Sequence, residues 1–346
     1  MLDRRVIAGL DAEVSAIGAG CWTIGGPAVN NGVPIGWDNV DPDLAYAGLV
    51  RAYELGITLY DTADVYGLGR SERLLGRLVR EVRRDYLVIS SKVGYFSGTA
   101  SHPYHPTQMR NQLATTLDNL GTDHLDMYSF HSLDFGDNDR YLPGAIEFMC
   151  GLRDQGVIRA IGIRAPHTFA EQWATGSRRE AAEIRRWLHL FGQIQPDVVT
   201  ARYNLISPLY AADETDIFRF ARGRGVGVLI KQALGEGLLL QSQQSDPPPQ
   251  FSTSDHRSID QAFSAARRHN LCARLAPIRA RFGDNPTALA RLCLRYALQH
   301  APDAAVLVGF RDAAQIHTNA TCLGDPLTDD EITEIRALLH SNTPAS

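Results

Sequence analysis

Four side chains that could take part in acid–base chemistry follow short apolar runs. Asp61 ends the run LYD, Lys92 ends LVISSK, His131 follows YSF, and Tyr66 comes five residues after Asp61. If these runs are parallel barrel strands, their C-terminal ends meet at one mouth, which is where such barrels place their chemistry. We therefore expect the four side chains to converge. Taken singly, Asp61 could cap a turn, Tyr66 could be a rim aromatic and His131 could be a structural histidine.

The four residue types together suit proton donation to an oxygen that becomes an alkoxide. A phenol has a pKa of about 10, and a nearby ammonium lowers that pKa by stabilising the phenolate. Lys92 would supply the ammonium, and Asp61 would hold it in place and charged. A neutral His131 would hydrogen-bond the substrate oxygen and orient it. The set predicts Tyr66 as a general acid.

Lysine is rare in this chain. Only Lys92 and Lys231 are lysines among its 34 basic residues. Arginine keeps its proton and has a wide planar head, whereas the pKa of a lysine can be moved. The bias indicates that Lys92 stands where arginine would not serve. Chance retention is the alternative, and for Lys231 it stays open.

The elements that must position these residues alternate between short apolar runs and longer helical patterns. Eight strands are expected, at Glu13–Gly18, Leu59–Asp61, Leu87–Lys92, His124–His131, Arg159–Ile163, Val198–Tyr203, Gly227–Lys231 and Ala304–Val308. The main helices are expected at Asp41–Leu55, Ser71–Val82, Pro106–Gly121, Leu142–Gly156, Phe169–Leu190, Thr215–Gly223 and Pro286–His300. Repeated β-then-α units, eight of them, predict an α/β fold of the TIM (β/α)8 barrel type.

A doubly wound sheet is the alternative fold. It would carry a glycine-rich fingerprint at the first strand-to-helix turn, and none is found there. Gly67, Gly69 and Gly76 resemble such a fingerprint, but they follow the second strand and the third glycine is misplaced. The barrel is therefore favoured.

Composition is typical of a globular protein with a hydrophobic core. Hydrophobic residues make up 44% and charged residues 21%, with a net charge of −5, which argues against nucleic-acid or membrane partners. The five cysteines lie far apart and form no C-x-x-C pair, so neither a disulfide framework nor a zinc site is expected. The absence of a signal peptide pattern predicts a cytoplasmic protein.

Three long loops follow expected strands and should lie at the C-terminal face of the barrel: Gly25–Asn39, Tyr95–His105 and Gln241–Ser258. We predict one domain over residues 1–346, with 241–258 as a loop insert after strand seven. A linker between domains is the alternative for its proline run. His102 and His105, three residues apart, could bind a metal, but an exposed loop is favoured and no metal is predicted.

Over nearly its whole length the chain resembles the aldo-keto reductase family. The resemblance is carried by DTADVYGLGRSERLLG, VISSKVG, LDMYSFHS and VGFRDAAQIHTNA. It implies NADPH-dependent reduction of an aldehyde or ketone, with Tyr66, Lys92, Asp61 and His131 as catalytic residues. It also implies that the adenosine end of NADPH is held by a segment after strand eight, with Arg311 on the 2′-phosphate: Gly309, Phe310, Arg311, Gln315 and Asn319.

The nicotinamide end departs from the family pattern. A Ser-Asn pair, a Gln and a stacking aromatic are replaced here by Arg164-Ala165, Thr200 and Lys231. The residues expected to contact the cofactor at this end are Trp22, Arg164, Thr200, Tyr203 and Lys231. Trp22, Trp37 and Phe96 are expected to line the substrate pocket, which suits an apolar or aromatic carbonyl compound. Arg164, pointing inward, would instead favour an anionic group.

Two other functions stay open at this point. A cofactor-binding regulatory or sensor subunit with little turnover is favoured by the altered nicotinamide contacts. An NADP-linked oxidation or isomerisation in a specialised pathway would use the same residues in reverse. The physiological substrate and the oligomeric state are not indicated by the sequence.

Overall fold

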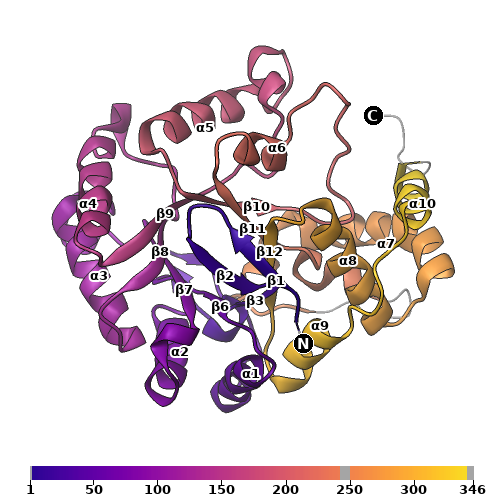
Figure 1. The fold of residues 1–346 in the computed structure, drawn as a ribbon, viewed down its shortest axis with the longest axis horizontal. Helices are drawn as coiled ribbons and strands as arrows, with labels where there is room; N and C mark the ends of the chain where they lie inside the picture. Colours follow the sequence, from indigo (N-terminus) through magenta and orange to yellow (C-terminus); the bar gives the residue numbers. More distant parts are fainter. Residues whose placement is uncertain (1, 242–249, 341–346) are drawn as a thin grey trace.

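Eight parallel strands form a closed barrel in this computed structural model, which describes residues 2–241 and 250–340 (Figure 1). Neighbouring strands follow one another along the chain, and the last pairs with the first. The strands are β3 Ile17–Gly20, β6 Leu59–Asp61, β7 Val88–Val93, β8 Leu125–Phe130, β9 Ile158–Arg164, β10 Val198–Arg202, β11 Gly227–Lys231 and β12 Ala304–Gly309. The predicted (β/α)8 fold is confirmed.

The first predicted strand, Glu13–Gly18, is wrong in its bounds. The apolar run spans two elements: β2 (Ala12–Ser15), which pairs antiparallel with β1 (Arg4–Ile7), and the barrel strand β3. The β1–β2 hairpin lies across the barrel (Figure 1), and its apolar residues pack on the first half of the strands. It closes the barrel end opposite the mouth. Only Ala16 separates the two elements, and apolar residues continue across it, so the pattern could not mark the break.

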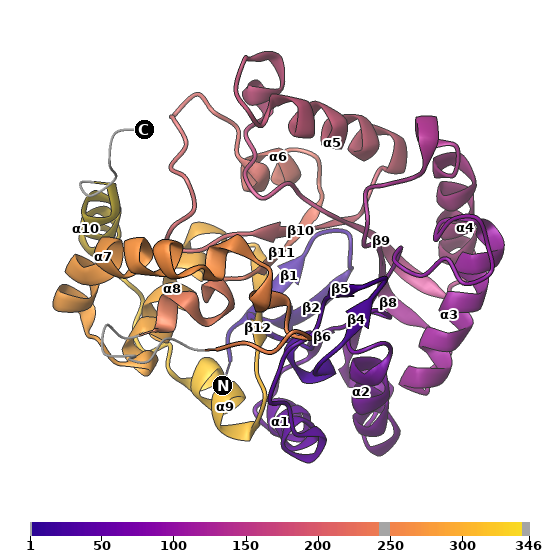
Figure 2. The ribbon, with the colours of Figure 1, turned by 180° about the vertical axis from the view of Figure 1, so that it is seen from behind.

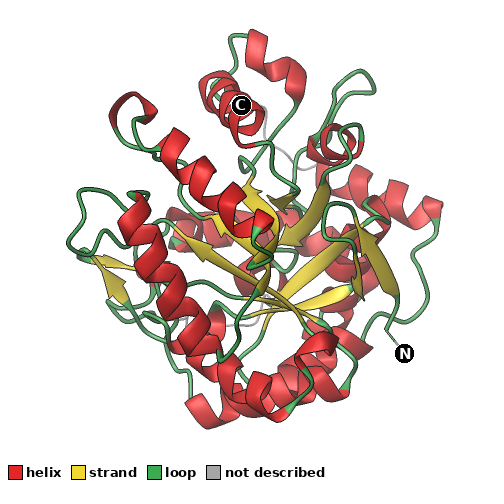
Figure 3. Ribbon diagram, turned by 60° about the vertical axis from the view of Figure 1, so that its left-hand side comes forward, coloured by secondary structure: helices red, strands yellow, loops and turns green. Residues whose placement is uncertain are grey.

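Helices surround the barrel, as Figures 2 and 3 show from two further directions. They are α1 Pro42–Glu54, α2 Arg70–Glu81, α3 Pro106–Leu120, α4 Leu142–Asp154, α5 Ala181–Ile194, α6 Ile217–Arg222, α7 Ala265–Phe282, α8 Pro286–His300, α9 Ala313–Thr321 and α10 Asp329–His340. Pro106 and Pro286 occupy the first turns of their helices, and Gly121 ends α3 in the left-handed conformation. None of the described helices has the length and apolar character needed to span a membrane.

The predicted helix Phe169–Leu190 is wrong in its extent. Its first part is a short 3-10 turn, Glu171–Thr175, which ends at Gly176 in an extended conformation. The helix itself, α5, begins only at Ala181. Apolar spacing continued across the break because Phe169 and Trp187 pack together, with ring centroids 5.0 Å apart. The helix-like spacing of apolar residues before Ala181 therefore reflects a tertiary contact and not a continuous helix.

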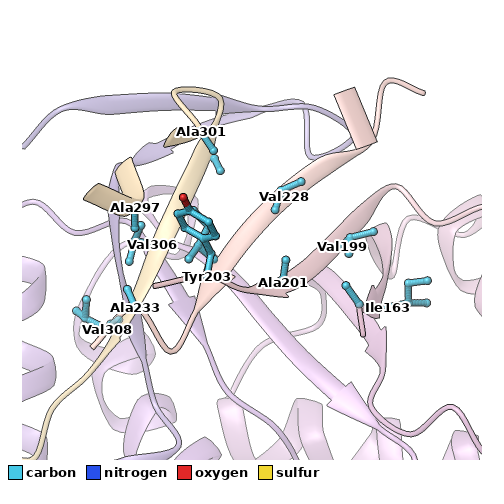
Figure 4. Close-up of a cluster of buried hydrophobic side chains, with 14 of the residues drawn as sticks. Ile163, Val199, Ala201, Tyr203, Val228, Ala233, Ala297, Ala301, Val306 and Val308 are labelled. Atoms are coloured by element: carbon cyan, nitrogen blue, oxygen red, sulfur yellow. The ribbon is translucent and has the colours of Figure 1, made fainter. Parts of the chain in front are cut away.

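The strands present alternating faces, and this decides which side chains reach the mouth. Figure 4 shows one face of the strands, on which Val306 lies near Ala297 of α8, and Ile163, Val199, Ala201, Val228 and Val308 belong to the same buried cluster. Successive strand residues point to opposite sides of a sheet. Residues one position away, such as Arg164, Thr200 and Lys231, therefore face the barrel interior.

Two of the predicted long loops meet over the mouth. Gly36 and Asp255 form a parallel β-bridge, and the His256 backbone N–H donates to the Gly36 carbonyl at 3.0 Å. The Asp38 N–H donates to the Asp255 carboxylate at 2.7 Å. The described part of the 241–258 segment thus joins the Gly25–Asn39 loop, while residues 242–249 lie outside the described chain. The predicted insert within a single domain stays a prediction.

Candidate active site

Asp61 and Lys92 form a buried ion pair at the mouth of the barrel. The Lys92 ammonium donates to Asp61 Oδ2 at 2.7 Å and to the Thr62 carbonyl at 2.5 Å, and each side chain is only 8% exposed. Ser90 Oγ donates to the other Asp61 oxygen at 2.9 Å. Burial lowers the pKa of Lys92, but Asp61 and Tyr66 raise it by more, so its net shift is upward. Lys92 is therefore held as a cation.

Tyr66 lies directly against this ammonium. Lys92 Nζ is 4.8 Å from the centre of the Tyr66 ring. Burial raises the pKa of Tyr66 to about 12, and the charge of Lys92 together with its hydrogen bond to the phenol lowers the pKa by less. The expected lowering by Lys92 is present, but the net direction expected from the sequence is wrong because burial outweighs it. Tyr66 is a neutral phenol at physiological pH, with a cation ready to stabilise its phenolate.

His131 completes the cluster from the end of β8. Its ring centroid is 5.6 Å from that of Tyr66, edge to face. Burial and the nearby positive charges, first that of Lys92, lower its pKa well below 6.5. The imidazole is therefore neutral, and its Nδ1 is buried without a hydrogen-bond partner in the described chain. The structure thus brings together Asp61, Tyr66, Lys92 and His131.

Close backbone contact fixes the position of Tyr66. A Cβ on Gly67 would lie 2.0 Å from the Gly25 carbonyl oxygen, and a Cβ on Gly25 would lie 2.8 Å from the Tyr66 carbonyl carbon. Gly67 also has a φ of +61°, which glycine adopts without strain. Two glycines therefore let the first loop lie on the backbone of Tyr66. This accounts for Gly67, the first of the glycines that imitate a dinucleotide fingerprint.

A buried polar network holds α2 against the strand that carries Lys92. The Glu72 carboxylate accepts hydrogen bonds from Ser91 at 2.8 Å, Thr116 at 2.9 Å and Asn119 at 3.0 Å. Because Ser91 precedes Lys92 and faces the helices, these bonds tie the outer side of β7 to α2 and α3. These hydrogen bonds therefore help to position the Lys92 ammonium, which lies on the inner side of β7.

Aromatic side chains cover the site from the two joined loops. The Trp22 ring lies 6.1 Å from Tyr66, 5.2 Å from Trp37 and 4.4 Å from His256, between centroids. His256 Nε2 is 2.8 Å from the Glu236 carboxylate. Trp22 and Trp37 therefore lie at the mouth, as expected. Phe96 makes no ring contact with another described aromatic residue, so the structure does not bring it into this cluster.

The segment after β12 lies beside Trp37, at the end of the aromatic cluster away from Tyr66. The Arg311 guanidinium is 5.7 Å from the centre of the Trp37 ring, and it has no ion pair within the described residues. The Gln315 side chain accepts from the Arg311 N–H at 3.0 Å, and Asn319 Nδ2 donates to the Gly309 carbonyl at 3.3 Å. Phe310 is different, because its ring is buried against α1 at Gly48. Only its backbone faces this site.

At the nicotinamide end, Arg164, Thr200 and Lys231 point into the barrel as their strand positions require. Lys231 has a pKa lowered to about 8 by burial, with further lowering by Arg164 and Lys92. Tyr203 is not part of this group. Its ring stacks on His300 at 4.2 Å and on Tyr296 at 5.7 Å, behind the strand (Figure 4). The structure does not bring Tyr203 to the mouth.

Sequence reasoning missed three residues of the site. Tyr95, rather than its neighbour Phe96, packs on His131 with ring centroids 4.8 Å apart. His256 lies against both tryptophans, and Ser90 binds Asp61. Ser90 had a usable signal, since it precedes Lys92 by two residues on the same strand and so faces the same side. No local pattern distinguished Tyr95 from Phe96, or joined His256 to a loop 220 residues away.

The two histidines of the 95–105 loop have structural partners. His105 Nδ1 accepts from the Thr107 N–H at 3.2 Å and so caps α3, while His102 stacks on Tyr141 at 4.4 Å. Among the described residues, no group of three or more histidine, cysteine or acidic side chains is placed to hold a metal ion.

Comparison with known proteins agrees with the barrel fold. The Aldo/keto reductase family model matches residues 16–340. The NADH-specific methylglyoxal reductase of Escherichia coli is 24% identical over 340 residues, covering 95% of each chain. The glycerol dehydrogenase AKR11B4 of Gluconobacter oxydans superposes with a TM-score of 0.73 at 24% identity, covering 99% of this chain and 98% of that one. A Klebsiella pneumoniae aldo/keto reductase solved with NADP and acetate gives 0.63 at 21% identity, covering 98% and 96%.

Proposed function

Because the chain belongs to the aldo/keto reductase family, we propose that it reduces an aldehyde or ketone to an alcohol with NADPH, using Tyr66 as the general acid. One observation carries the proposal: a neutral phenol, a buried Lys–Asp pair and a neutral imidazole meet at the mouth of the barrel. This combination can give a proton to an oxygen and stabilise the phenolate that remains.

The described residues fit a phosphorylated dinucleotide. Arg311 is a cation without an ion pair in the described chain and lies over the face of Trp37. Guanidinium groups favour phosphate because they donate in a planar fork. Gln315 and Asn319 follow at four-residue intervals, so they line one side of α9 beside it. The free charge supports NADPH over NADH, in contrast to the NADH-specific Escherichia coli relative.

NADPH, when bound, supplies the hydride. The chain's own residues perform the proton chemistry. His131 is neutral because burial and Lys92 lower its pKa, so it can donate a hydrogen bond to the carbonyl oxygen and orient it. Tyr66 donates its hydroxyl proton to that oxygen as negative charge develops there, and the Lys92 ammonium stabilises the resulting phenolate. Asp61 keeps the ammonium in place, bonded at 2.7 Å. Alcohol oxidation would use the same groups in reverse, with Tyr66 accepting the proton.

The cofactor assignment is tested by fluorescence titration of the protein with NADPH and with NADH. We expect tighter binding of NADPH. Loss of Arg311 in Arg311→Ala should weaken NADPH binding about tenfold or more, the size of one charged hydrogen bond, and leave NADH within about threefold. Arg222→Ala, which breaks an exposed pair with Asp303, is the control and should change neither. Equal weakening for both cofactors in Arg311→Ala would contradict the assignment.

Turnover is tested by the loss of reduced-nicotinamide absorbance with a panel of aldehydes. The proposal expects reduction of at least one member of the panel at a rate that depends on enzyme concentration. A protein that binds NADPH tightly but reduces none of them would instead be the cofactor-binding sensor, and the proposed function would be wrong.

A further inference from the structure

Three cationic side chains stand together at the mouth, beside the catalytic cluster. Arg164 ends β9, Arg202 ends β10 and Lys231 ends β11. In the strand register, Arg202 is paired with Lys231, and Arg164 with Thr200, two residues before Arg202. All three positions face the barrel interior, and neighbouring strands lie about 4.8 Å apart. The three cations, called here the mouth cations, therefore share one side of the opening.

The three mouth cations act together on a neighbouring histidine. The pKa of His167 is lowered to about 4 by burial and by the charges of all three. Two of them, Arg164 and Lys231, also lower the pKa of His131. The positive field of the group thus reaches the imidazole that would orient the carbonyl.

No carboxylate neutralises the mouth cations within the described chain. None of the three forms an ion pair within 4.0 Å. Glu236, whose charge reaches Lys231 and Arg202, is bonded to Gln232 and to His256. Asp260 caps the turn at Ala262, and Asp61 is bonded to Lys92. Like charges gathered without counter-charges destabilise one another, so a site of this kind is completed by an anion.

The 2′-phosphate site proposed at Arg311 does not account for the group. Arg311, at the end of β12, is the unpaired cation at the adenosine end, across Trp37 and Trp22 from Tyr66. Arg164 and Lys231 instead lie close enough to His131, where the reacting carbonyl would lie, for their charges to lower its pKa. An oxidised nicotinamide ring carries positive charge and would be repelled there. An anion on the substrate would offset that repulsion.

We propose that the substrate carries an oxyanion, a carboxylate or a phosphate, close to its carbonyl group, and that Arg164, Arg202 and Lys231 bind it. The inference rests on the proposed function and narrows its substrate class from apolar carbonyl compounds to anionic ones. Guanidinium groups can grip either oxyanion through paired N–H donors, and Lys231 adds a compact charge.

The test compares charged substrates with uncharged ones of nearly the same shape. We would measure kcat/KM for para-carboxybenzaldehyde against its methyl ester, and for glycolaldehyde phosphate against glycolaldehyde. The wild type should prefer the charged member of at least one pair by about tenfold or more, and the pair that shows it identifies the oxyanion. A preference for the neutral member in both pairs would overturn the proposal.

Variants assign the preference to the mouth cations. Arg202→Gln should lower kcat/KM for the charged substrate about tenfold, mainly through KM, and leave the neutral one within about twofold. Arg164→Gln should lower kcat/KM for the charged substrate about tenfold more than for the neutral one. Arg164→Lys, which keeps the charge, should recover part of the loss. Arg178→Gln is the matched control, because Arg178 is 56% exposed and pairs with Glu214 instead. Equal losses for both substrates would mean that these residues serve the cofactor or the alkoxide, and the inference would be wrong.

A binding measurement separates this inference from the proposed function. If the protein reduces no member of the aldehyde panel, the proposed function fails, but the anion site can still be measured. Thermal-shift titration of the NADP-loaded protein with para-carboxybenzyl alcohol should then give a larger stabilisation than its methyl ester. That difference should disappear in Arg164→Gln. Equal stabilisation by the acid and the ester would overturn the anion site.

Discussion

The Lys92–Asp61 pair makes a quantitative prediction about stability. Both side chains are 8% exposed and 2.7 Å apart, so removing one leaves the other as a buried charge without its partner. Breaking such a pair costs about 3 to 5 kcal/mol. Lys92→Met should therefore lower the free energy of unfolding by about that amount, although Ser90 still donates to Asp61. Asp61→Asn should lower it similarly, since Lys92 would keep hydrogen-bond partners, among them the Thr62 carbonyl, but lose its counter-charge.

The double variant Asp61→Asn, Lys92→Met distinguishes a buried pair from two independent contacts. Because it leaves no uncompensated charge, it should be more stable than the sum of the single losses predicts, by about 2 kcal/mol. Urea unfolding followed by circular dichroism gives all three values. The Arg222–Asp303 pair, whose side chains are 55% and 48% exposed, is the control, and Arg222→Met should cost no more than about 1 kcal/mol. Additive losses, or losses no larger than the control's, would refute the reasoning.

Three further predictions follow from other buried or strained positions. The pKa of Asp64 is raised well above its usual value by burial and by Glu72, so the folded state holds a proton that the unfolded state releases, and stability falls as pH rises above the unfolded pKa of about 4. Asp64→Asn should therefore gain stability relative to the wild type between about pH 5 and pH 8 in urea unfolding, and a constant difference would contradict the raised pKa. Lys231, with a pKa of about 8, faces Arg164, Lys92, Asp61 and Glu236. Lys231 loses its charge above that pH, so the KM for an anionic substrate should rise above about pH 8 in the wild type but not in Lys231→Met. The same rise in both proteins would show that Lys231 is not part of the anion site. Gly67→Ala places a Cβ 2.0 Å from the Gly25 carbonyl oxygen, so it should displace Tyr66 and lower kcat, whereas Gly192→Ala, with open space around it, should leave kcat unchanged.

The barrel could be predicted from the sequence because the signals for its strands and helix ends are local. Each strand is a short apolar run, and Gly121 or Pro106 marks a helix end whatever surrounds it. Asp61, Lys92 and His131 could be placed together for the same reason, since each stands at or just beyond the end of a strand and strand ends converge. The N-terminal hairpin was missed, because its alternation continues directly into β3.

Features that depend on contacts distant in sequence could not be predicted. Tyr203 is an exception, because it stands two residues after the outward-facing Ala201, and alternation along the strand would have placed its ring behind the barrel, where it stacks on Tyr296. His256 reaches Trp22 through a bridge between two loops. The net pKa shift of Tyr66 depends on the competition between burial, which raises the pKa, and Lys92, which lowers it. The spacing of the motif does not indicate how deeply Tyr66 is buried, so the net direction could not be predicted.

The central claim, that Tyr66 donates the proton, is tested most directly by Tyr66→Phe, which removes only the hydroxyl. Steady-state kcat with saturating NADPH and the best aldehyde would be measured beside the dissociation constant for NADPH. The account predicts that kcat falls by about 100-fold or more while the dissociation constant changes by less than about threefold. A variant that keeps more than about a tenth of the wild-type kcat would contradict it.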